Sequence, residues 1–227
     1  MIPFSLWHLC FAMDILQNQI IQFLYFIVAL VVTLTAHEAS HALVAYYLGD
    51  PTAKIHGRLT LNPIAHLDPI GSLLFLLTQT VGWGKPVPVN SANFKSPVRD
   101  SALTALAGPV SNFILAFAVA LPLKYLGTYL PDAINLLFWM VFHVSVLLGV
   151  FNLFPFPPLD GSKVLGLFMP RKFYNAYDNY LNNGVKYFVA IILVDVFILR
   201  SLFGFSFLGY LMQNLSNAIS AVLLLGT

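Results

Sequence analysis

The chain has 227 residues, of which 59% are hydrophobic and 9% are charged. An ordinary soluble domain has about 45–50% apolar and about 25% charged residues, so this composition indicates an integral membrane protein and excludes a typical soluble domain. The net charge of +2 is too small to indicate nucleic-acid binding, and the single cysteine, Cys10, excludes an intramolecular disulfide or a cysteine-rich metal site.

The first long apolar segment contains the strongest motif in the chain. Residues 1–17 carry no lysine or arginine and no small-residue cleavage site, so we expect them to form a lead-in and not a secretory signal. The apolar segment at 18–48 then contains the zinc-binding pattern H-E-x-x-H, with its histidines at His37 and His41. Histidines four apart on a helix lie about 40° from each other around the axis, so both can reach one metal ion. Glu38, which directly follows His37, is the only glutamate in the chain and is the candidate catalytic base.

Four further apolar runs approach or exceed the length of about 20 residues that crosses a bilayer, and they lie at 101–126, 134–154, 183–200 and 204–225. We therefore expect an all-α polytopic membrane protein with about five transmembrane helices. There is no internal repeat and no long linker, which indicates one membrane-embedded domain over 1–227. Within it we expect a catalytic core at 18–165 and C-terminal helices at 183–227.

A shorter apolar run at 69–83 determines the topology. Cations flank it on both sides, and the positive-inside rule places both flanks in the cytoplasm. On that assignment nine cations lie on the cytoplasmic side of the membrane and two, Lys124 and Arg200, lie on the outer side. The run must then enter and leave on the same face, so we expect a re-entrant loop or small β-hairpin between the HExxH helix and the next full helix. We also expect the alternating residues 85–90 to pair with an extended substrate.

The segment from Asn152 to Gly161 (N-L-F-P-F-P-P-L-D-G) supplies the third candidate ligand. Three prolines in four positions forbid a regular helix, so the chain should unwind into an extended stretch that ends at Asp160. A catalytic zinc site commonly has three protein ligands and one open position, and His37, His41 and Asp160 would complete such a site. If 69–83 does not cross the membrane, the two segments that carry these ligands run in parallel toward the cytoplasmic face.

Taken together, these motifs resemble the site-2 protease family of intramembrane zinc metalloproteases, in its compact bacterial branch without a PDZ domain. The matching stretches are His37–His41, Ala107–Asn112 and Asn152–Gly161, together with the loop residues 59–71 and 82–90. The resemblance implies that His37, His41 and Asp160 bind zinc and that Glu38 is the catalytic base. It also implies that Asn112 and Asn152 help to hold the substrate backbone.

The function expected from these observations is hydrolysis of a peptide bond within or near the transmembrane segment of a single-pass membrane protein. The expected location is the cell membrane, here the bacterial inner membrane, with the site toward the cytoplasm. Two other classes stay open at this point: a metal-binding transporter, which often shows repeated halves with matching broken helices, and a non-catalytic adaptor that binds single-pass proteins. The sequence predicts no oligomeric state.

Three polar residues outside the motif have open roles. His66 and Asp68 could form a second polar cluster with His56, although bracing of the loop beside Pro63 and Pro69 is the favoured reading. Asp195 lies within an apolar helix, where a charge is expensive, and it could pair with Arg200 or His143.

Overall fold

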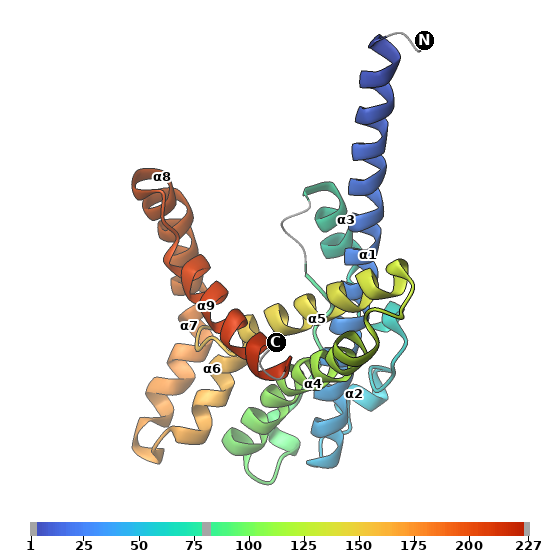
Figure 1. Cartoon of the computed structure of the whole chain (residues 1–227). Helices are drawn as coiled ribbons and strands as arrows, with labels where there is room; N and C mark the ends of the chain where they lie inside the picture. The colour runs from blue at the N-terminus through green and yellow to red at the C-terminus, as the bar shows by residue number, and fades with distance from the viewer. Residues whose placement is uncertain (1–3, 79–82, 225–227) are drawn as a thin grey trace.

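The computed structural model describes residues 4–78 and 83–224, which form helices joined by loops (Figure 1). In chain order the helices are α1 (Phe4–Tyr47), α2 (Thr52–Ile55), α3 (Pro69–Thr78), α4 (Pro97–Leu126), α5 (Asp132–Asn152), α6 (Asp160–Val164), α7 (Tyr174–Leu193), α8 (Arg200–Phe203) and α9 (Phe207–Leu223). Short 3-10 turns lie at Pro63–Ala65, Ser91–Asn93, Leu165–Phe168 and Arg171–Phe173, and a π-helical stretch, Val194–Leu199, follows α7.

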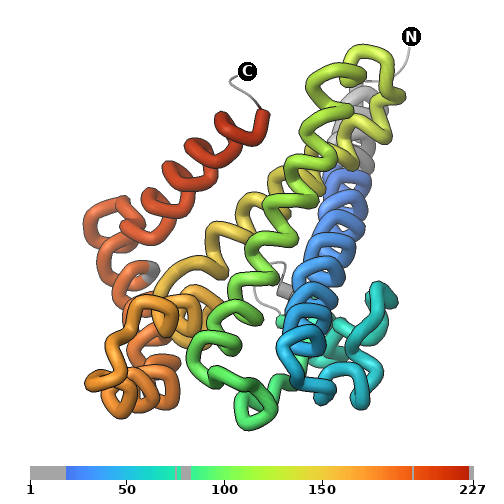
Figure 2. The backbone as a smooth tube through the Cα atoms, turned by 90° about the horizontal axis from the view of Figure 1, so that it is seen from below, coloured from blue at the N-terminus to red at the C-terminus, as the bar shows by residue number. Residues whose placement is uncertain are grey.

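Three helical stretches are long and apolar enough to cross a membrane: Gln19–Tyr47 within α1, Pro97–Leu126 in α4 and Asp132–Asn152 in α5. These helices pack against one another. In Figure 2, α1 and α5 run in the same general direction, while α4 runs in the opposite one. The C-terminal part of α1 and the end of α5 therefore reach the same side of the bundle, as the sequence predicts.

The predicted count of five transmembrane helices is not confirmed. The C-terminal apolar runs form two helical stretches, Arg171–Phe203 and Phe207–Leu223, that meet at an angle of 98°. Together they count as one broken span at most, so the described residues have three or at most four spans. The bend follows Gly204, whose φ of 64° lies in the left-handed region that glycine tolerates best. Beyond the bend, α9 has 17 residues, so it is about 26 Å long and shorter than the hydrocarbon core of about 30 Å. The last residue of the predicted run 204–225 lies outside the described residues.

Asp195 stabilises this bend. Its carboxylate accepts hydrogen bonds from the backbone N–H groups of Phe207 at 2.8 Å and Leu208 at 3.2 Å, and from the Ser206 hydroxyl. These N–H groups open α9 and have no partner within that helix, so a carboxylate there supplies acceptors and favourable charge. The buried aspartate is a helix cap, and neither Arg200 nor His143 is its partner in the described part of the chain.

The run at 69–83 begins with a short helix. α3 has 10 residues, which is about 15 Å of helix and half of the hydrocarbon core of about 30 Å, so α3 is too short to cross. Residues 79–82 of the run lie outside the described residues. The expected hairpin is not confirmed: within 4–78 and 83–224 there is an isolated antiparallel bridge between Leu67 and Gly84 but no strand.

Replacing Asp195 with alanine removes three hydrogen bonds at the start of α9. Because loss of an N-terminal cap costs about 1 kcal/mol, we expect amide hydrogen exchange at Phe207 and Leu208 to become about 5- to 10-fold faster. Residue-resolved exchange in detergent micelles measures this. Asp132→Ala, an exposed aspartate at the start of α5, is the control and should leave α9 unchanged. Equal exchange in Asp195→Ala and the unmodified protein would contradict the assignment.

Candidate metal centre

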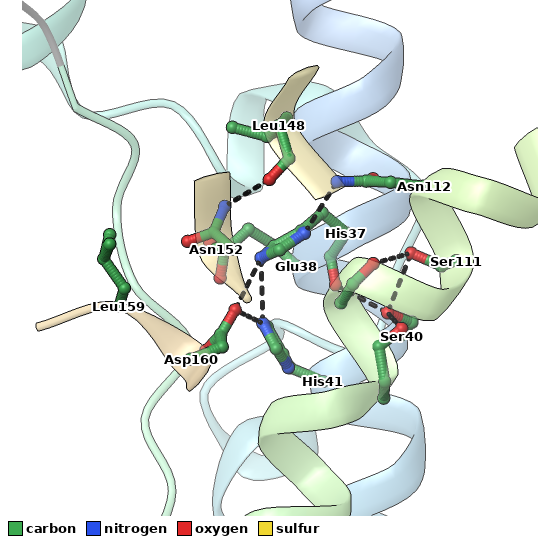
Figure 3. Close-up of polar contacts among 12 residues, drawn as sticks. His37, Glu38, Ser40, His41, Ser111, Asn112, Leu148, Asn152, Leu159 and Asp160 are labelled. Carbon is green, nitrogen blue, oxygen red and sulfur yellow. Dashed lines mark hydrogen bonds and ion pairs between the residues drawn. The ribbon is translucent and has the colours of Figure 1, made fainter. Parts of the chain in front are cut away.

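The three predicted ligands converge on one point (Figure 3). The Nε2 atoms of His37 and His41 are 3.0 Å apart, and the Asp160 Oδ2 atom lies 3.1 Å from the first and 3.3 Å from the second. Both histidines lie on α1, one turn apart, and both are buried. Among the described residues these three side chains form the group of His, Cys, Asp or Glu that can hold a metal ion.

The unwound stretch after α5 brings Asp160 to the histidines. α5 ends at Asn152, and α6 begins at Asp160 itself, so the proline-rich residues between them form the predicted break. A Cβ atom at Gly161 would lie 2.2 Å from the Leu153 carbonyl oxygen, so only glycine allows the chain to turn this tightly.

A main-chain carbonyl fixes the orientation of His41. The Nδ1 atom of His41 lies 2.7 Å from the carbonyl oxygen of Thr104 on α4. A carbonyl can only accept, so Nδ1 carries the proton and Nε2 keeps its lone pair facing His37 and Asp160. Metal-binding histidines commonly donate their second N–H to such an acceptor, which sets the tautomer.

Asn112 plays the same part for His37. The Nδ1 atom of His37 is 3.0 Å from the Asn112 side-chain amide, whose Oδ1 is buried with no partner among the described residues. Exchanging the amide nitrogen and oxygen places Oδ1 where it accepts from the Nδ1–H group of His37. Asn112 is 0% exposed and orients His37, while its expected role in holding the substrate backbone stays a prediction.

The space beside the imidazoles exists because residue 108 is glycine. A Cβ atom on Gly108 would lie 2.5 Å from His41 Nε2 and 2.6 Å from His37 Nε2, closer than nonbonded atoms approach. The backbone of α4 therefore borders the point on which the ligand atoms converge. An alanine there would occupy space that a metal ion needs.

The residues fit a zinc ion. With Nδ1 protonated on both histidines, two nitrogen lone pairs and one carboxylate oxygen face one another with no hydrogen between them, an arrangement that a cation stabilises. Ligand atoms that are about 2.0–2.1 Å from a tetrahedral zinc ion lie about 3.3 Å from one another, close to the separations observed here. Nitrogen and oxygen donors suit zinc, and three protein ligands leave a fourth position open.

A cavity of about 580 Å³ is lined by His37, His41 and Asp160. Glu38 lines it, and its Oε2 atom accepts a hydrogen bond of 3.2 Å from the backbone N–H of Val87. Asn152 also lines the cavity; its Nδ2 donates to the Leu148 carbonyl at 3.0 Å, which leaves its Oδ1 to accept from another group. Sequence reasoning placed Glu38 and Asn152 at the site, but it missed Thr104, whose contribution is a main-chain carbonyl.

The second polar cluster considered from the sequence does not form. His66 is buried and its Nε2 lies 2.8 Å from the Thr60 carbonyl, so it braces the loop. The Asp68 carboxylate accepts from Gly71 N–H at 2.8 Å and caps α3. His56 is exposed and its Nδ1 lies 2.8 Å from the Thr52 carbonyl, one turn back.

Comparison with known proteins points to one family. Residues 128–194 match the sequence model of Peptidase family M50, a range that includes Asp160 but not the HExxH motif. YwhC of Bacillus subtilis, named a putative zinc metalloprotease, is 42% identical over 153 residues, which cover 64% of this chain and 69% of YwhC. Rip2 of Mycolicibacterium smegmatis, named in the same way, is 31% identical over 151 residues, 63% of this chain and 56% of Rip2. The chain thus spans little more than half of that relative, and no solved structure matches it.

Gly108→Ala should abolish zinc binding, because the added Cβ would lie against both Nε2 atoms. We expect about one zinc ion per chain in the unmodified protein and a large loss in the variant, as measured by elemental analysis after purification. Ala118→Val adds volume at an exposed position of the same helix and should retain zinc. Circular dichroism checks that both variants are folded, and a folded Gly108→Ala protein with normal zinc would contradict the assignment.

Proposed function

Because this chain belongs to peptidase family M50 and is a zinc metalloprotease, we propose that it is an intramembrane endopeptidase that cleaves single-pass membrane proteins within or near their transmembrane segment. The observation that supports this most strongly is the convergence of His37, His41 and Asp160 within a bundle of helices that are apolar enough to cross a membrane. The family assignment favours this function over the transporter and the adaptor.

In this proposal His37, His41 and Asp160 hold the zinc ion, and Glu38 is the general base. A zinc ion bound there would polarise the scissile carbonyl and lower the pKa of a water molecule toward about 7. Glu38 takes a proton from the attacking water and later gives it to the leaving amine. Asn152, through its Oδ1 atom, accepts a hydrogen bond from the substrate backbone.

The cavity limits how a substrate can bind. A transmembrane helix makes its backbone hydrogen bonds internally, so it must unwind locally before its peptide bond reaches Glu38. The extended residues 85–90 border the cavity but offer few free donors: Pro86 and Pro88 have none, and the N–H groups of Lys85, Val87 and Asn90 bind His66, Glu38 and Asp50. Pairing of the kind expected from the sequence would therefore depend mainly on carbonyl groups of this segment.

We also propose that the protein lies in the cell membrane with its site toward the cytoplasm. The charge asymmetry supports this, because nine of the cations belong to the segments that follow α1 and α5 or flank α3. The loop between α4 and α5 would then face the outside.

Glu38→Gln should reduce cleavage of a single-pass substrate by at least about 100-fold while zinc stays bound, because an amide cannot take the proton. His37→Ala, His41→Ala and Asp160→Ala should each lose zinc as well as activity. The measurements are cleavage in reconstituted vesicles and zinc content of the same samples. His56→Ala and Asp132→Ala change exposed residues of the same types and serve as controls.

Equal cleavage by the unmodified protein and Glu38→Gln would contradict the role of Glu38. Normal zinc in all three ligand variants would remove the proposed centre. Removal of zinc with a chelator should stop cleavage, and added zinc should restore it.

Cysteine labelling in intact cells tests the orientation. In a Cys10→Ser background, Tyr129→Cys should react with a membrane-impermeant maleimide from outside, since Tyr129 is 84% exposed in the loop between α4 and α5. Lys172→Cys, also exposed, should react only after permeabilisation. The reverse pattern would place the metal centre toward the outside.

A further inference from the structure

The segment 84–93, here named the strap, lines part of the cavity and contacts Glu38 through Val87. Its first part is held through the main chain of Lys85, whose N–H donates to the His66 carbonyl at 2.9 Å. The Lys85 carbonyl accepts a hydrogen bond from the Nη2 atom of Arg58. A Cβ atom on Gly84 would lie 2.9 Å from a Leu34 methyl group of α1, so the strap packs tightly against the helix that carries the HExxH motif.

Arg58 is an unusual residue for this position. It is 4% exposed, and its Nε and Nη1 atoms are buried with no partner among the described residues. Burial lowers the pKa of Arg58, and the negative charge of nearby Glu38 offsets part of that effect. Burying a guanidinium group costs free energy unless the group is paired, so packing alone does not explain an arginine at this position.

Within the part of the strap that contacts Glu38, a single backbone N–H group is available as a donor. Pro86 and Pro88 have no N–H and restrict φ, so Val87 has the only N–H between Lys85 and Val89. That N–H donates to Glu38 Oε2 at 3.2 Å. Two residues earlier, Lys85 is held through its N–H by His66 and through its carbonyl by Arg58, so these two contacts restrict where the Val87 amide can lie.

A buried carboxylate holds the other end of the strap. Asp50 is 0% exposed and accepts from Asn90 N–H at 2.7 Å and from Asn93 Nδ2 at 2.7 Å. Burial by itself would raise the pKa of Asp50, but the hydrogen bonds from Thr52, Asn93 and Asn90 lower it by more. The strap is therefore anchored at both ends by buried charged groups from the loop that follows α1.

We propose that Arg58 is a positioning residue for the catalytic base: it fixes the strap through the Lys85 carbonyl, so that the Val87 amide holds one oxygen of Glu38 and leaves the other to act in the cavity. Arg58 touches neither metal ligand nor substrate in this account. The expected effect on catalysis rests on the proposed function. The contacts from Arg58 to Lys85 and from Val87 to Glu38 do not depend on it.

The test compares Arg58→Gln, Arg58→Lys and Glu38→Ala with the unmodified full-length protein. Hydrogen exchange resolved to single residues reports the Val87 amide directly, since the flanking prolines have no amide of their own. We expect faster exchange at Val87 in Arg58→Gln, whose amide donor is two bonds shorter than Nη2 of arginine, and in Glu38→Ala. We expect partial restoration in Arg58→Lys, whose charged donor is one bond shorter and comes closer to the Lys85 carbonyl. Arg99→Gln, an exposed arginine on α4, is the matched control and should change nothing.

Activity provides the second readout. Arg58→Gln should retain zinc and lose up to about 100-fold in kcat, with a smaller change in KM, because misplacement of a reacting group affects the chemical step. Arg58→Lys should recover part of that loss. Unchanged exchange at Val87, loss of zinc in Arg58→Gln, or normal kcat despite faster exchange would each overturn the proposal. If the unmodified protein holds zinc but cleaves no single-pass substrate, the proposed function fails, and exchange at Val87 still decides whether Arg58 positions Glu38.

Discussion

The backbone of α4 passes against the two imidazoles of α1, and this close approach depends on the missing side chain at Gly108. Neighbouring contacts have the same character: the Ser40 hydroxyl lies 3.0 Å from the Ala107 carbonyl and 3.2 Å from the Ser111 hydroxyl. Small residues let two helix backbones come close, and hydroxyl groups supply hydrogen bonds that lipid cannot. The placement of α4 therefore encloses the centre and brings the Thr104 carbonyl to His41.

Main-chain groups do much of the positioning around this centre. The Thr104 carbonyl orients His41, and the Val87 amide contacts Glu38. Side chains at a distance, such as Arg58 and Asp50, act by holding the main chain of the strap and not by touching the reacting atoms. In this arrangement the geometry of the base depends on the loop after α1 as much as on α1 itself.

The three metal ligands could be predicted from the sequence because each lies in a recognisable local sequence pattern. Helical periodicity places His37 beside His41, and the proline-rich break together with the charge asymmetry brings Asp160 to the same side of the bundle. It could not find a main-chain carbonyl, because any residue at position 104 has one. The contact between Asn112 and His37 depends on the packing of a buried amide, and the number of spans depends on the helix break at Gly204. Hydropathy shows neither feature.

The metal centre is expected to hold one zinc ion, bound by His37, His41 and Asp160. Zinc K-edge X-ray absorption fine structure on the purified protein tests it most directly. We expect scattering from two imidazole rings and from nitrogen or oxygen ligands at about 2.0–2.2 Å, with no sulfur. In Asp160→Ala we expect this signal to be lost or to show fewer protein ligands. A sulfur ligand, the absence of imidazole scattering, or an identical spectrum in Asp160→Ala would contradict it.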